Sequence, residues 1–285
     1  MGVCKVDKII AKYTSKNPNI TVDETMFDSG GMKKVYYAKD INNNNQYVLK
    51  IVEINDDNSE KRTRRELAIL DSLKSDYFPK IHDVFDCQVD GKNYVIILEQ
   101  RIYGINLRGY MKENKIPEAE AIDFCTHIIK ALKIIHTEGL VHRDVKPENI
   151  MITNTKELVL LDFGIARDLT DTSITSDLSP YGPMTIGYAA PEQIKNNKRL
   201  ISARTDFFAW AIVSAELLNG ENPLKEGCKN QSEVLQKTLK VSELNLDINV
   251  SDNNIKELIK KNLQYEVHKR SNNEEEILKF LEAGK

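Results

Sequence analysis

Two polar motifs in the middle of the chain carry side chains that could transfer a phosphoryl group. They read His142-Arg143-Asp144-Val145-Lys146-Pro147-Glu148-Asn149 and Asp162-Phe163-Gly164. Phosphoryl transfer to a hydroxyl needs a base near that hydroxyl and ligands for a cation that neutralises the phosphates. Asp144 fits the base, and Asn149 and Asp162 offer the oxygen atoms that Mg²⁺ prefers. These motifs therefore predict a phosphoryl-transfer site.

Lys146 supports the same chemistry. It follows Asp144 by two positions, and its ammonium could balance charge on the moving phosphoryl group. A lysine at this place favours serine or threonine as the acceptor. Taken singly, Asp144 could be a turn former and Asn149 a helix cap. The order and spacing of all these residues favour the chemical interpretation.

The segments around the motifs predict the elements that position them. Short apolar runs at 150–152 and 158–161 are typical of two buried strands. The apolar residues of 117–137 repeat at helical spacing and predict a buried helix that leads into the first motif. We expect the histidines and the cysteine of this helix, and His142, to be structural.

The first hundred residues predict an antiparallel meander followed by a helix. Strands are expected at 20–26, 34–39 and 46–51, separated by a glycine turn and an Asn-rich turn. A helix is expected at 59–74, where an apolar stripe shares its inward edge with Glu66.

From about Asp28 to Arg270 the combined motifs resemble those of the eukaryotic-type (Hanks-type) serine/threonine protein kinases. The sequence around Gly30 is similar to that of the bacterial branch of this family. The resemblance implies an α+β, two-lobed fold: a small antiparallel-sheet N-lobe with one key helix and a larger helical C-lobe. It divides one catalytic domain into an N-terminal extension (1–19), an N-lobe (20–99), a hinge (100–104) and a C-lobe (105–285).

The resemblance also assigns roles around the catalytic lysine. It implies that Lys50 contacts the α- and β-phosphates of ATP and pairs with a helix glutamate, for which we choose Glu66. The alternatives are Glu60 as the partner, or a solvated Glu66 paired with a neighbouring basic residue.

A nucleotide pocket follows from the same resemblance, with adenine bound to the backbone of Glu99 and Arg101, and Leu98 behind it. The residues expected to contact the nucleotide are Gly30, Gly31, Val35, Val48, Lys50, Leu98, Glu99, Arg101 and Met151. Asp28 and Lys33 replace two of the family's three glycines, so this loop taken alone could equally be a surface hairpin. The apolar members could equally be plain core.

A polar segment between Asp162 and Glu192 resembles the family's activation loop. Arg143 precedes the base, and a guanidinium pairs well with a phosphate dianion, so we expect a phosphorylated loop. The candidate autophosphorylation sites are Thr172, Thr175 and Ser176. A surface loop whose hydroxyl groups have no role is the alternative.

Three further residues match structural positions of the family. The resemblance implies that Thr185 contacts the base, that Asp206 holds the backbone of the catalytic loop, and that Arg270 pairs with Glu192.

Composition narrows the class of protein. The chain has 285 residues, of which 41% are hydrophobic, which is enough for a large core. A net charge of −3 does not indicate binding to nucleic acid or to an anionic membrane. The sequence shows no apolar run of membrane-spanning length and no leader, and the four cysteines lack metal-site spacing, so we expect a cytoplasmic protein with reduced thiols.

The leading interpretation is a serine/threonine protein kinase that uses ATP with Mg²⁺, or Mn²⁺ in its place, acts on a protein substrate, and forms a transient homodimer for autophosphorylation. The second is a pseudokinase or regulatory scaffold that binds nucleotide through a degenerate glycine loop. The third is a small-molecule kinase, against which Lys146-Pro147 and the segment 185–192 argue.

Overall fold

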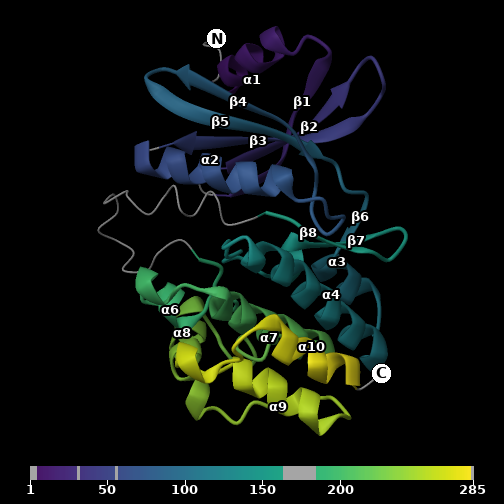
Figure 1. Cartoon of the computed structure of the whole chain (residues 1–285), viewed down its shortest axis with the longest axis vertical. Coiled ribbons are helices and arrows are strands. Elements are labelled where there is room, and N and C mark those ends of the chain that lie inside the picture. The colour runs from purple at the N-terminus through teal and green to yellow at the C-terminus, as the bar shows by residue number, and fades with distance from the viewer. Residues whose placement is uncertain (1–4, 31–32, 55–56, 163–183, 284–285) are drawn as a thin grey trace. The chain divides into compact units, whose positions relative to one another are not determined.

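The computed structural model describes residues 5–30, 33–54, 57–162 and 184–283 (Figure 1). Within these ranges the side chains of Asp28, Lys33 and Glu66 lie outside the described part of the structure. The chain divides into two compact units, and the boundary between them falls between Tyr103 and Gly104, inside the segment expected as the hinge.

Unit 1 is built on one antiparallel sheet with the strand order β1-β2-β3-β5-β4. The strands are β1 (Ile20–Gly30), β2 (Lys33–Asp40), β3 (Gln46–Ile54), β4 (Ile81–Val89) and β5 (Lys92–Gln100). The first three confirm the predicted meander. β3 and β5 lie inside the sheet, and both read as apolar runs because each of their faces is covered.

Two helices pack on opposite faces of this sheet (Figure 1). Helix α2 (Asp57–Ser72) lies on one face, where Leu67 packs with Val52 and Ile97. Helix α1 (Lys5–Lys16) covers the other face with Ile9 and Tyr13. The segment 1–19 was expected only as an N-terminal extension, yet Tyr13 is fully buried and α1 belongs to the core of unit 1.

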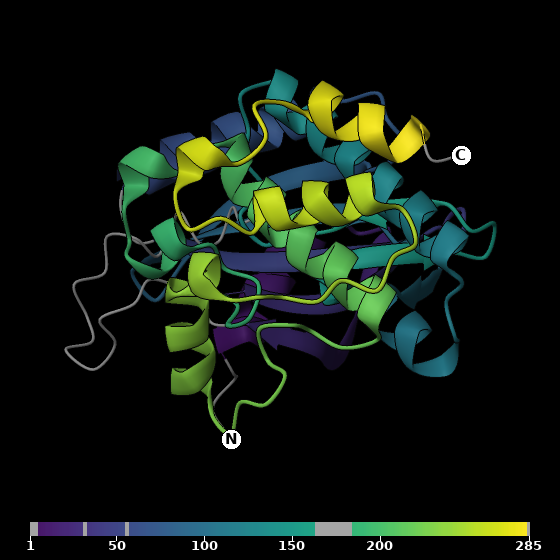
Figure 2. The same cartoon turned by 90° about the horizontal axis from the view of Figure 1, so that it is seen from below.

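Unit 2 is mainly helical. In the described residues its α-helices are α3 (Leu107–Glu113), α4 (Glu118–Thr137), α6 (Pro191–Ile194), α7 (Ala203–Asn219), α8 (Gln231–Leu239), α9 (Asn253–Asn262) and α10 (Glu274–Ala283). Helix α7 is buried almost throughout and packs against α4 and α9, while α10 packs against α4 (Figure 2). The indole of Trp210 on α7 donates a 2.9 Å hydrogen bond to the carbonyl of Cys125 on α4, which ties the two central helices together.

A small three-stranded sheet in unit 2 carries the catalytic motifs. It consists of β6 (Gly104–Asn106), β7 (Ile150–Thr153) and β8 (Leu158–Leu160). The apolar runs predicted as strands at 150–152 and 158–161, and the helix predicted at 117–137, are confirmed. The α+β class is confirmed as well, because unit 1 holds the antiparallel sheet and unit 2 most of the helices.

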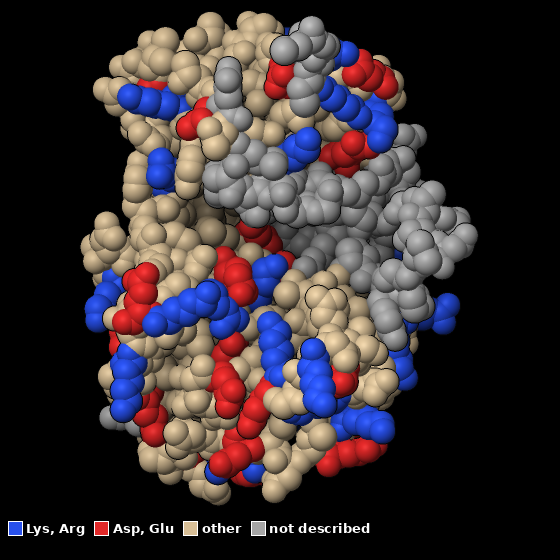
Figure 3. Space-filling model, turned by 180° about the vertical axis from the view of Figure 1, so that it is seen from behind, with Lys and Arg blue, Asp and Glu red and all other residues tan. Residues whose placement is uncertain are grey.

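Charged side chains of both signs are interspersed on the described surface of unit 2 seen in Figure 3. This agrees with the small net charge of the chain. None of the helices in the described part of the chain combines the length and apolarity that a bilayer span requires.

Candidate functional site

In unit 1, the pairing of β2, β3 and β5 brings four predicted nucleotide contacts to one face of the sheet. Val35 lies directly opposite Lys50, and Val48 lies directly opposite Glu99. Side chains opposite each other in a sheet share a face, and so do residues two apart along a strand. Val35, Val48, Lys50 and Glu99 therefore lie together, on the face that α2 covers further along β3.

Lys50 forms an ion pair with Glu99 on this face. The two side chains are only 11% and 13% exposed, so the pair is largely withdrawn from water. The partner that we predicted, Glu66, is carried by α2, but its side chain lies outside the described part of the structure. Glu99 was expected to contribute only its backbone, and the role of its carboxylate was not predicted from the sequence.

Leu98 lies on the opposite face of the sheet from Lys50. It packs with Leu49 and with Ile9 and Tyr13 of α1. The predicted place of Leu98 at the back of the pocket does not match this packing, because neighbouring strand residues point to opposite faces. Of the two residues, Glu99 shares the face of the lysine.

The glycine segment and the end of β5 complete the predicted nucleotide contacts in unit 1. Gly30 pairs with Lys33 across β1 and β2, while Gly31 lies outside the described residues. Arg101 donates a 2.6 Å hydrogen bond to the side chain of Gln46 and lies over the ring of Tyr37, 4.1 Å from its centroid. The contact with Tyr37 is a cation–π interaction.

In unit 2, Asp144 lies at the centre of a polar cluster. Its Oδ2 accepts a 3.0 Å hydrogen bond from the amide of Asn149 and pairs with the ammonium of Lys146 at 3.0 Å. Its Oδ1 accepts a 2.8 Å hydrogen bond from the hydroxyl of Thr185. The ammonium of Lys146 also donates to that hydroxyl, at 3.1 Å. The contact between Thr185 and the base that the resemblance implied is present.

The β7–β8 hairpin holds the two predicted metal ligands at adjacent positions. Ile150 pairs with Leu160, and the backbone carbonyl of Asn149 accepts a 2.7 Å bond from the N–H of Leu161, the residue before Asp162. The amide nitrogen of Asn149 is committed to Asp144, so its amide oxygen is the atom that suits a hard cation. An amide oxygen and a carboxylate fit Mg²⁺ here. Met151, another residue expected to contact the nucleotide, lies on β7 opposite Val159.

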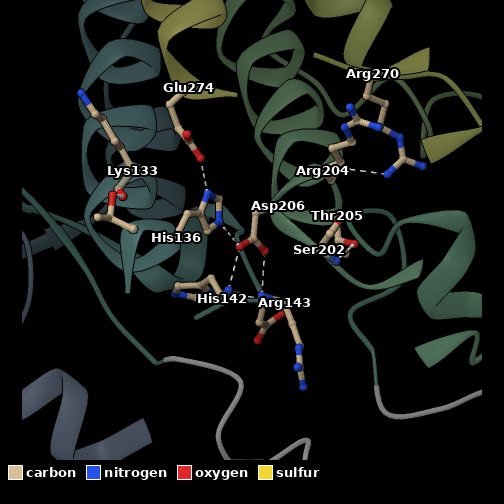
Figure 4. Close-up of polar contacts among 12 residues, drawn as sticks. Lys133, His136, His142, Arg143, Ser202, Arg204, Thr205, Asp206, Arg270 and Glu274 are labelled. Carbon is tan, nitrogen blue, oxygen red and sulfur yellow. Dashed lines mark hydrogen bonds and ion pairs between the residues drawn. The ribbon is translucent and has the colours of Figure 1, made fainter. Parts of the chain in front are cut away.

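Asp206 holds the backbone at the start of the catalytic loop, as the resemblance implied (Figure 4). Its two carboxylate oxygens accept 2.7 Å hydrogen bonds from the backbone N–H groups of His142 and Arg143. Arg143 has a φ of 66°, an uncommon left-handed conformation that these contacts help to stabilise.

His142 is a structural member of the loop. Its Nε2 lies 3.0 Å from the carbonyl of Leu161, and its Nδ1 accepts a 3.3 Å bond from the N–H of Asp144. This pattern requires the proton on Nε2. Burial lowers the pKa of His142, which agrees with a neutral ring that connects the two catalytic motifs.

The predicted phosphorylation sites Thr172, Thr175 and Ser176 lie outside the described residues, as does the rest of the segment 163–183, whose phosphate was expected to pair with Arg143. The ion pair predicted between Glu192 and Arg270 is confirmed. Both side chains are buried, and the guanidinium makes two hydrogen bonds to the carboxylate at 2.7 and 2.9 Å. The segment after Thr185 is thereby attached to the C-terminal part of unit 2.

Two further residues anchor the site and were not recognised from the sequence. Arg108 on α3 donates a 2.9 Å hydrogen bond to Glu148 in the catalytic loop and pairs with Glu216 on α7 at 2.6 Å. His136 on α4 was expected only as a core residue, yet its Nε2 lies 2.8 Å from the carboxylate of Asp206. Periodicity identified the helix of His136 but carried no signal for its partners, and α3, which carries Arg108, was not predicted.

The fold and these motifs define a protein kinase domain. The family model described as "Protein kinase domain" matches residues 24–280, so the chain belongs to this family.

The curated relatives include bacterial proteins named as serine/threonine kinases. The chain is 32% identical over 206 residues to "Probable serine/threonine-protein kinase PknB" of Corynebacterium glutamicum, covering 71% of this chain and 32% of that protein. It is 34% identical over 198 residues to "Serine/threonine-protein kinase PrkC" of Bacillus subtilis, and the match covers 68% of this chain and 29% of that protein. It is also 34% identical over 200 residues to "Serine/threonine-protein kinase PknD" of Mycobacterium tuberculosis, and this match covers 69% of this chain and 29% of that protein. The matches thus span about a third of the length of these relatives.

Proposed function

We propose that the chain is an active kinase domain that transfers the γ-phosphoryl group of ATP to serine or threonine hydroxyls of proteins. The substrate oxygen forms a bond to the γ-phosphorus as the bond to the leaving ADP oxygen breaks, and Asp144 accepts the hydroxyl proton. Lys50 holds the inner phosphates and Lys146 balances charge on the transferred group. Asn149 and Asp162 bind Mg²⁺, which shields the phosphate charge.

The observation that carries this proposal is the cluster around Asp144. One carboxylate is contacted by an ammonium, an amide and a hydroxyl from Lys146, Asn149 and Thr185, so its orientation is fixed before substrate arrives. Preorganised polar groups of this kind lower the barrier because they need little reorganisation during the reaction. Lys146 is also the residue that favours serine or threonine acceptors.

The test is a phosphorylation assay with the purified chain, ATP and Mg²⁺, both alone and with a generic basic protein. Phosphosites are mapped by mass spectrometry for the wild type and for Asp144→Asn in parallel. Phosphoserine or phosphothreonine produced by the wild type and not by the variant supports the proposal. Equal labelling with both proteins, or none with either, contradicts it.

A second candidate is a nucleotide-binding pseudokinase or regulatory scaffold. It is favoured by Asp28 and Lys33, which stand where the family has glycines. An acid and a base in this loop would change how closely the backbone approaches the phosphates. Nucleotide binding by calorimetry, without phosphate transfer in the assay above, would favour this candidate.

Autophosphorylation at Thr172, Thr175 or Ser176 in a transient homodimer is a further part of the proposal. It is supported by the place of Arg143 directly before the base, because a guanidinium can bind a phosphate on a nearby loop. Mass spectrometry of the wild type alone tests it, and a rate that rises with the square of the protein concentration would indicate reaction between two copies. We also propose a cytoplasmic location, because Cys87, Cys125 and Cys228 are free thiols.

A further inference from the structure

A buried histidine connects the C-terminal helix α10 to the catalytic loop (Figure 4). Glu274, the first residue of α10, forms a hydrogen bond with Nδ1 of His136. The other ring nitrogen of His136 lies 2.8 Å from Oδ2 of Asp206, and that same oxygen accepts the N–H of His142 at 2.7 Å. A continuous line of contacts therefore runs from Glu274 to the loop that carries the candidate base.

The burial of these groups makes the line of contacts energetically important. The side chain of Asp206 is 0% exposed, that of His136 is 6% exposed and that of Glu274 is 13% exposed. A buried carboxylate is stable only when charges or hydrogen bonds balance it. A protonated His136 between the two acids supplies that balance, and it can donate one hydrogen bond to each.

We propose that Glu274 is a positioning residue for the catalytic loop: it fixes the ring of His136, which in turn fixes the Asp206 carboxylate that holds the backbone just before Asp144. Glu274 touches neither substrate nor nucleotide in this proposal. Its effect on the reaction rests on the proposed kinase activity, whereas its effect on the loop backbone does not.

The titratable and charged groups near His136 lie on helices α4, α7 and α10 and on the loop that follows α4. Helix α7 supplies Asp206 and helix α10 supplies Glu274, while the loop supplies His142, which burial keeps neutral. Lys133 of α4 contributes a positive charge near Glu274, and its own ion pair is with Glu275. The ring of Phe207 approaches the imidazole edge-on, with centroids 5.7 Å apart, and adds no charge.

The pKa values of the group agree with a charged histidine. Burial acts to lower the pKa of His136, but the hydrogen bonds to Asp206 and Glu274 outweigh it and raise the pKa to about 9. Burial acts to raise the pKa of Glu274, and the contact with His136 brings it below its ordinary value. Loss of the Glu274 charge should therefore make the histidine easier to deprotonate.

The experiment compares the wild type with Glu274→Gln, which keeps the shape of the side chain and removes its charge. The pKa of His136 is measured by NMR, with His136→Gln to assign its signal. We expect this pKa to fall by about one unit, the size typical of losing one nearby opposite charge. Hydrogen exchange at the amides of His142 and Arg143 should become faster, and the alkaline limb of kcat should move to lower pH, so that kcat at about pH 8.5 drops roughly threefold. The KM for ATP at about pH 6.5 should not change.

Glu275→Gln is the matched control. Glu275 is the next residue of the same helix and also pairs with α4, but its side chain is 67% exposed and its partner Lys133 is 45% exposed. This variant should leave the pKa of His136, the exchange rates and the kcat profile unchanged.

The outcomes separate this inference from the proposed kinase activity. Amide exchange at His142 and Arg143 that is the same in Glu274→Gln and wild type would overturn the positioning role, whatever the kinetics show. An altered exchange rate in a chain whose wild type transfers no phosphate would support the positioning role and contradict the kinase activity. A shifted kcat profile in Glu275→Gln as well would mean that any carboxylate on α10 acts in this way, which also overturns the inference.

Discussion

Lys50 and Glu99 form an ion pair across β3 and β5, and the register of the sheet accounts for it. Glu99 lies opposite Val48, two residues before Lys50, which makes the lysine and the glutamate diagonal neighbours on one face. Long side chains can meet across such a diagonal. The carboxylate is therefore supplied by a central strand of the sheet, next to the residue that we expect to hold the inner phosphates.

The first prediction concerns this carboxylate. Glu99→Gln should lower the KM for ATP by about threefold to tenfold, which corresponds to roughly 1 kcal/mol. The reason is electrostatic. The variant removes a negative charge near the phosphates, so the ammonium of Lys50 no longer pairs with a carboxylate and can interact with the phosphates only. Steady-state kinetics with ATP as the varied substrate measure this.

Glu53→Gln is the control for Glu99. Glu53 also lies on β3 and pairs with Lys92 of β5, but it is on the face of the sheet away from Lys50, so its removal should leave the KM for ATP unchanged. If Glu99→Gln instead raised the KM, Glu99 would be an anchor that Lys50 needs.

The second prediction concerns the hydroxyl that binds the base. Thr185→Ala removes the 2.8 Å hydrogen bond to Asp144 and the contact with Lys146. The loss of one such bond costs about 1–2 kcal/mol, so kcat should fall on the order of tenfold. Thr185→Ser keeps the hydroxyl and should retain most of the activity. Equal losses in both variants would show that the methyl group is what matters. Single-turnover rates measure the effect on the chemical step.

The third prediction concerns the buried ion pair between Glu192 and Arg270. Arg270→Ala should lower the free energy of unfolding by about 3–5 kcal/mol, because it leaves a carboxylate buried without its cation. Urea denaturation followed by circular dichroism measures this. Lys269→Ala is the neighbouring control. The side chains of Lys269 and of its partner Glu266 are 51% and 39% exposed, so the free energy of unfolding should change by less than about 1 kcal/mol. A loss of similar size in both variants would contradict the importance that we give to burial.

The fourth prediction is a dependence of stability on pH that comes from His136. The pKa of this residue is about 9 in the folded chain, whereas an unfolded histidine loses its proton near its ordinary value of about 6.5. Between these values the folded state binds the extra proton, so the contribution of His136 is complete below about pH 6.5 and is lost as the pH rises through about 9. Chemical denaturation across this range should show a steeper decline for the wild type than for His136→Gln. Parallel curves for the two proteins would contradict the raised pKa.

Much of the fold could be predicted from the chain alone, because strand and helix periods depend on neighbouring residues. The expected helix 59–74 is α2 at 57–72, and the expected strands around Asn149 and Asp162 form the β7–β8 hairpin. The motif residues Asp144, Lys146 and Asn149 lie within six positions of one another, so their meeting in one loop follows from local sequence. The partnership of Glu192 with Arg270 was reached through family resemblance, since 78 positions separate the two residues.

Other features were decided only by tertiary structure. Whether Leu98 or Glu99 shares the face of Lys50 depends on the register of two strands, and a slip by one residue would exchange them. Glu274 and His136 are 138 positions apart, and only the packing of α10 against α4 brings the acid to the ring. Sequence patterns identify which side chains can do chemistry and which elements carry them. The partners of those side chains depend on long-range packing, which leaves no periodic trace in the sequence.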